Sequence, residues 1–135
     1  MVEITAAKAH AAIAAGVKKA TELGSPSSIS VVDSGRNLIG FLRMDGALLA
    51  SIEISQAKAY TARSLNMKTG DVTPYVQPGG PFYGMETSHR QALVVFAGGL
   101  PVTTDGNGIG AVGVAGGSLE NDVAVAEAVL AALTP

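Results

Sequence analysis

The stretch Gly106-Asn107-Gly108-Ile109-Gly110-Ala111-Val112-Gly113-Val114-Ala115-Gly116-Gly117 decides the fold of this chain. It contains the spacing Gly-x-Gly-x-x-Gly, which in dinucleotide-binding proteins lies between a strand and the helix whose N-terminus binds the pyrophosphate. Here the glycines alternate with apolar residues, as in a strand, and the next helix begins only at Ser118. We therefore predict a glycine-rich core strand, where missing side chains let another part of the structure come close.

Hydrophobic periodicity and turn residues predict the other elements. Helices are expected from Thr5, as N-cap, to Leu23, from about Leu49 to Leu65, and from Ser118 onward, with a short helix near 70–76. Strands are expected at residues 28–33, 38–44, 92–96, 100–104 and 108–115. Because short turns join most of these strands, neighbours should pair antiparallel. The prediction is an α/β protein of the α+β type, in the order αββα(α)βββα, with helices packed on a five-stranded antiparallel sheet.

Composition narrows the possible functions. The 135 residues suit a single domain, residues 1–135, and the absence of cysteine excludes disulfides, thiolate nucleophiles and cysteine-ligated metals. A net charge of -2 with 15 % charged residues predicts neither nucleic acid nor a membrane as partner. The N-terminus lacks the pattern of a signal peptide, so we expect a cytoplasmic protein. An apolar content of 47 % with so few charges predicts buried interfaces in a homo-oligomer.

Candidate chemistry centres on two histidines. His89 follows a Pro/Gly-rich loop just before a predicted strand, so it could act as an acid–base group with Glu86, ligate an axial position of haem, or simply lie at the surface. His10 flanks the apolar stripe of the first helix and is the other axial candidate or a half-exposed structural residue. Ser88 beside His89 forms no triad, because adjacent residues rarely bring hydroxyl and imidazole together in the required geometry. Nucleophilic hydrolysis is not predicted.

Cationic and aromatic residues supply candidate ligand contacts. Arg43 and Lys58 could hold a ligand carboxylate near a helix N-terminus, which also favours negative charge. The alternatives are a solvated salt-bridge network that includes Asp45 and Glu53, and a Lys58 ammonium that reaches solvent. The loop of residues 77–85 brings Tyr83 and Met85 together among prolines and glycines, which is typical of a pocket lid or of an oligomer contact.

Six motifs occur in order along nearly the whole chain. They are residues 31–36 (VVDSGR), 43–47 (RMDGA), 51–59 (SIEISQAKA), 79–84 (GGPFYG), 96–101 (FAGGLP) and 110–117 (GAVGVAGG). Together they resemble the GlcG/HbpS family, which includes the C-terminal domain of PduO-type proteins. The resemblance implies a profilin-like domain with a central antiparallel sheet, assembled as a homo-oligomer, often an octamer or a smaller ring-like set. It also implies haem binding or degradation in some members and a link to cobalamin metabolism in others.

The resemblance also implies site residues. In relatives a histidine of the first helix, or a threonine elsewhere, has been proposed to ligate haem, and His10 is the nearest counterpart of that histidine. Many relatives have an asparagine followed by glycines where this chain has residues 88–92 (SHRQA), a departure that makes His89 a candidate of its own. Arg43 or Arg90 would lie near a propionate. Gly98 and Gly99, in the fifth motif, complete the ligand-binding candidates.

Three functions remain open from the sequence. The favoured one is a haem, tetrapyrrole or small-ligand binding protein, with His10 or His89 as axial ligand and no metal other than haem iron. The second is an enzyme on a small carboxylated or carbonyl substrate, in which His89 or Glu86 moves a proton while Arg43 or Lys58 holds the anion. The third is a non-catalytic accessory protein of an oxidation pathway.

Overall fold

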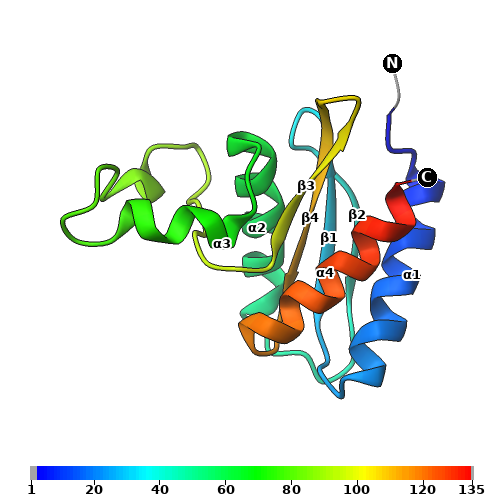
Figure 1. Ribbon diagram of the computed structural model, residues 1–135. Helices are drawn as coiled ribbons and strands as arrows, with labels where there is room; N and C mark the ends of the chain where they lie inside the picture. Colours follow the sequence, from blue (N-terminus) through cyan, green and yellow to red (C-terminus); the bar gives the residue numbers. More distant parts are fainter. Residues whose placement is uncertain (1–2, 135) are drawn as a thin grey trace.

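The computed structural model describes residues 3–134, in which one antiparallel sheet lies between layers of helices (Figure 1). The strands are β1 (Ser28–Asp33), β2 (Leu38–Arg43), β3 (Gly99–Thr104) and β4 (Asn107–Ala115). Their spatial order is β2-β1-β4-β3, and every neighbouring pair is antiparallel. β1 and β4, which are far apart in the sequence, therefore pair at the centre, while β2 and β3 form the two edges.

Helices cover both faces of the sheet. α1 (Ala6–Glu22) and α4 (Leu119–Leu133) lie together on one face, and α2 (Ser51–Leu65) covers the other on its way from edge strand β2 towards edge strand β3 (Figure 1). The predicted caps are confirmed: the hydroxyl of Thr5 accepts from the Lys8 amide at 3.1 Å, and that of Ser118 accepts from the Asn121 amide at 3.1 Å. Gly24, with φ of +63°, follows the end of α1.

The glycine-rich stretch is strand β4, and its glycines let helix α2 pack close to the strand. A Cβ atom added at Gly113 would run into the carbonyl oxygen of Ser55 and would lie 2.6 Å from the amide nitrogen of Ala59. On the same face, the hydroxyl of Ser55 lies 2.8 Å from that of Ser30 in the neighbouring strand β1. The predicted close approach is confirmed, and the approaching element is a helix of the same chain.

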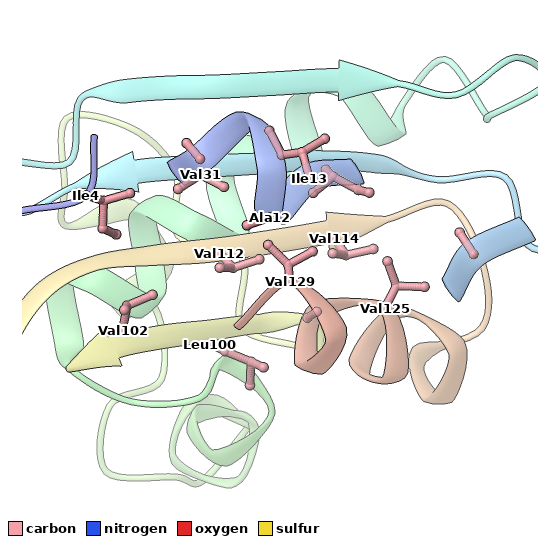
Figure 2. Packing of buried hydrophobic residues seen from close by; sticks show 14 of the residues in the cluster. Ile4, Ala12, Ile13, Val31, Leu100, Val102, Val112, Val114, Val125 and Val129 are labelled. Atoms are coloured by element: carbon pink, nitrogen blue, oxygen red, sulfur yellow. The ribbon is translucent and has the colours of Figure 1, made fainter. Parts of the chain in front are cut away.

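The larger apolar core lies between the sheet and the α1–α4 layer (Figure 2). Val112 and Val114 of β4 meet Ile13 of α1 and Val129 of α4 there, and the three valines are fully buried. The α2 face has a smaller cluster made of Val32, Ala59, Ala62 and Ala111. Small side chains on that face let α2 pack close to the sheet.

The expected fifth strand is wrong. Residues 92–96 form no strand, and the sheet built from residues 3–134 has four strands. Side chains of other elements bind this segment instead: the Val94 amide donates to the hydroxyl of Thr61 at 3.0 Å, and the Val95 carbonyl accepts from the hydroxyl of Thr73. Because threonine side chains satisfy these backbone groups, the apolar run needs no pairing with β3.

The short helix predicted near 70–76 is confirmed as two consecutive turns. They are α3 (Thr69–Val72) and the 3-10 helix η1 (Thr73–Val76), and a second 3-10 helix, η2 (Met85–Thr87), follows. The segment between α2 and β3 extends away from the sheet, beyond α2 (Figure 1). It carries His89 and most of the exposed aromatic side chains.

Candidate functional site

His10 lines a depression between α1 and edge strand β2. The depression has a volume of about 240 Å³, and its walls include the apolar side chains of Ile13, Ile39 and Leu42. Gly40 lets the helix lie close to the strand, because a Cβ atom there would be 2.9 Å from the terminal methyl of Ile13. We call the set Ala6, His10, Ile13, Ile39, Gly40, Phe41 and Leu42 the α1–β2 groove. An exposed imidazole at an apolar groove is available for a ligand.

Arg43 lies where β2 ends and lines the next depression along the same seam. That depression, about 380 Å³, is also lined by Val17, Met44 and Leu42, and Leu42 is shared with the α1–β2 groove. The Arg43 guanidinium donates to the carbonyl of Ala47 at 2.8 Å and 3.3 Å. Arg43 is exposed, so a cation stands at the far end of the apolar seam from His10.

Lys58 is a structural anchor. Its ammonium donates to Asp122 Oδ2 at 3.1 Å and to the Val114 carbonyl at 2.8 Å, with side-chain exposures of 1 % for Lys58 and 3 % for Asp122. It also lies 5.1 Å from the ring centre of Phe96. Burial lowers the pKa of Lys58 below its usual 10.5, partly offset by the charge of Asp122 and the hydrogen bond to it. With these partners, the ammonium joins α2, β4 and α4.

Gly98 and Gly99 are buried against Lys58. A Cβ atom at Gly98, where φ is +128°, would lie 2.6 Å from the Lys58 ammonium, and one at Gly99 would lie 2.6 Å from the Lys58 carbonyl oxygen. Both glycines therefore allow the chain to pass close to α2. The binding role predicted for these two glycines and for Lys58 stays a prediction.

His89 lies at a different place from His10. It is half-buried, its Nδ1 is 2.9 Å from the Ser88 hydroxyl, and it packs edge-on against Tyr60 with ring centres 6.2 Å apart. No hydrogen bond joins it to Glu86 among the described residues, and one carboxylate oxygen of Glu86, Oε1, is buried without a hydrogen-bond partner there. The structure thus separates the predicted acid–base pair from Arg43, which lies at the opposite end of β2 from the turn beside His89.

The remaining candidates are exposed. Tyr83 is 68 % exposed, Arg90 is exposed, and Met85 is half-buried at the start of η2. Tyr83 and Met85 lie in the segment that extends away from the sheet, far from the α1–β2 groove on the other side of it (Figure 1). These residues therefore form no common site with His10.

Sequence reasoning missed a cluster around Tyr60. Arg36 lies over the Tyr60 ring at 4.7 Å, and its Nη1 donates to the Tyr60 hydroxyl at 3.0 Å and to Ser64 at 3.3 Å. Arg63 and His89 line the same depression, which has a volume of about 220 Å³. The sequence signal was Arg36 itself, which ends the first motif (residues 31–36) and lies in the turn of residues 34–37, where side chains are usually just solvated.

The described residues meet the requirements neither of a metal-ion site nor of a membrane-spanning helix. Within residues 3–134, no three histidine, aspartate or glutamate side chains gather in a way that would hold a metal ion. None of the helices in that range combines the length and apolarity that crossing a membrane requires.

The four-stranded antiparallel sheet with helices on both faces defines an α+β protein. A family model described as haem degrading protein HbpS-like matches residues 4–131, so the chain belongs to the HbpS-like family. A 15.0 kDa protein from the dhaT-dhaS intergenic region of Citrobacter freundii is 46 % identical, over 94 % of this chain and 89 % of that protein.

Solved structures agree with this membership. Protein ORFY of Klebsiella pneumoniae superimposes with a TM-score of 0.94 at 42 % identity, covering 98 % of this chain and 92 % of that one. A crystal structure of a PduOC:heme complex superimposes with a TM-score of 0.92 at 35 % identity, covering 97 % and 95 %. The resemblance seen in the six motifs is confirmed.

Proposed function

We propose that this protein binds haem or a related tetrapyrrole in the α1–β2 groove, with His10 as the axial ligand. The observation that carries the proposal is the position of His10, an exposed imidazole on an apolar groove between α1 and β2. Imidazole is a common axial ligand of haem iron. Support comes from the family, which is described as haem degrading, and from the structure of a relative in complex with haem.

The residues of the groove fit such a ligand. Ile13, Ile39 and Leu42 provide an apolar surface for one face of a flat macrocycle, and Arg43 stands further along the seam, where it would pair with a propionate. When bound, haem would supply iron-centred ligand and redox chemistry. The chain itself would hold the group, orient it through His10 and shield one face from water.

The groove would cover only one face of a bound macrocycle, so a second chain would cover the other face. β2 is an edge strand whose side chains Leu38, Phe41 and Leu42 are exposed by 48 %, 36 % and 38 %. Exposed apolar edge strands pair readily with another chain. We therefore infer a homo-oligomer in which β2 contributes to the interface, to be checked by light scattering after gel filtration of wild type and a Leu42→Lys variant.

The test of haem binding is a haemin titration followed by absorbance. Wild type should give a saturable Soret band, and His10→Ala should lose it or bind about tenfold more weakly or worse. His89→Ala is the matched control, because it removes the other histidine and leaves the groove intact. Circular dichroism should show both variants folded. A Soret band retained in His10→Ala, or lost only in His89→Ala, would overturn the assignment of the axial ligand.

A further inference from the structure

We infer that the depression beside Tyr60 is a second ligand site, which binds a small oxyanion, a carboxylate or phosphate group, between Arg36 and Arg63. The site is distinct from the α1–β2 groove and does not depend on the proposed haem binding. Ser34, Arg36, Arg63, Ser64 and His89 line it, in a volume of about 220 Å³. Two guanidinium groups, two hydroxyls and an imidazole thus line one open depression, which has room for a small acid.

The charges at this site are unbalanced. Within residues 3–134 the ion pair of Lys58 and Asp122 is the only one, so neither Arg36 nor Arg63 has a carboxylate within 4.0 Å. Glu3 and Asp105 line the adjoining larger cleft, which shares Arg63 and Ser34 with this site, but neither forms an ion pair with Arg63. Two arginines that face one depression without an acidic partner attract an anion from solution.

Arg36 is held in place by the protein. It follows Gly35 in the turn between β1 and β2 and has φ of +69°, a conformation that costs a side-chain-bearing residue energy and favours glycine. Asp33 stabilises this turn, since its Oδ1 accepts from the amides of Gly35 and Asn37, both at 2.9 Å. An arginine kept in a strained backbone conformation by such a network indicates that the side chain is needed there.

The guanidinium groups are oriented, and part of each remains available. Arg36 stacks on the buried Tyr60 ring and makes its hydrogen bonds through Nη1, so Nε and Nη2 make none to the described residues. Arg63 donates through Nε to the Ser34 carbonyl and through Nη1 to Asn66, both at 2.8 Å, which leaves Nη2. Fixed arginine donors suit the planar, two-oxygen geometry of carboxylate and phosphate.

His89 and Ser64 complete the site. The Nδ1 of His89 faces the Ser88 hydroxyl, and its Nε2 makes no hydrogen bond to the described residues. Ser64 donates to the Tyr60 carbonyl at 2.7 Å and accepts from Arg36. The ring contact with Tyr60 fixes the imidazole at the rim, where it can donate or accept a hydrogen bond from a bound acid.

The test is an NMR titration of the full chain with inorganic phosphate and, separately, with oxalate, with chloride adjusted to keep ionic strength constant. Saturable amide shifts should be confined to the turn of residues 33–37, the end of α2 and the neighbourhood of His89. Tighter binding of oxalate would assign a carboxylate ligand and tighter binding of phosphate a phosphorylated one, and either result supports the site.

Variants distinguish a specific anion site from nonspecific attraction of anions to positive charge. Arg36→Lys keeps the charge but loses the planar fork, so the dissociation constant should rise about tenfold or more, and Arg63→Lys should act in the same direction. Lys18→Gln removes an exposed charge at the far end of α1 and should change the constant less than about twofold. Equal effects of all three variants, or shifts that rise linearly and spread over all basic residues, would overturn the inference. Haem binding through His10 would be unaffected by that failure.

Discussion

Replacing Lys58 with methionine should destabilise the fold strongly. The lysine side chain is 1 % exposed and makes the only ion pair within residues 3–134, with an aspartate that is 3 % exposed. Methionine fills a similar volume but removes the positive charge, so Asp122 would remain buried with one hydrogen bond, from the Gly117 amide at 3.0 Å. An uncompensated buried carboxylate is the expected cause of the loss.

The magnitude follows from the cost of breaking a buried pair. Removing one partner of such a pair destabilises by about 3–5 kcal/mol. The Val114 carbonyl also loses its bond to the ammonium, which adds about 1 kcal/mol. A stability loss of this size corresponds to a fall in Tm on the order of 10–20 °C for a chain of this length.

Urea unfolding followed by circular dichroism measures the change, and a double variant controls for packing. In Lys58→Met/Asp122→Leu no charge stays buried, so most of the lost stability should return, because apolar replacements of buried pairs are often neutral or stabilising. A single variant that costs less than about 1 kcal/mol, or a double variant less stable than the single one, would refute the view that an unpaired Asp122 causes the loss.

Three further outcomes are expected. Because burial lowers the pKa of Lys58, the folded chain releases that proton at a lower pH than the unfolded chain. The unfolding free energy of wild type relative to Lys58→Met should therefore rise as pH increases towards 10.5. Urea titrations at a series of pH values measure this difference, and a fall across that window would contradict the expectation. Gly113→Ala should lower the unfolding free energy by about 1–3 kcal/mol or more, because the new methyl meets the backbone of α2. In the same assay Gly35→Ala is the control: its new methyl meets only side-chain atoms, so the loss should be less than about 1 kcal/mol. Asp33→Ala should cost about 1 kcal/mol by loosening the turn and should weaken phosphate binding; unchanged binding would separate the turn from the anion site.

Local sequence patterns were sufficient for most elements. Alternation, helical spacing and cap residues such as Thr5 and Ser118 predicted the helices and four of the strands, because these signals act over a few neighbouring residues. The same patterns predicted that the glycines of β4 admit a close neighbour. The strand predicted at residues 92–96 is absent. A short apolar segment does not reveal whether its backbone will pair with a strand or with threonine side chains.

The candidate sites depended on tertiary structure. The sequence singled out His10, His89 and Arg43, but which of them share a surface depends on where α1, β2 and the turn at Arg36 meet. Lys58 was considered for a ligand, and only the packing of α2 against β4 and α4 showed that Asp122 engages it. Arg36 ends the first motif and Arg63 lies outside all six motifs, and nothing in the sequence links the two, so folding alone brings them to one depression. The sequence by itself determined most of the elements and the family, since local periodicity and motif order encode them. Only the tertiary structure decided which charges are buried, which are paired and which face solvent together.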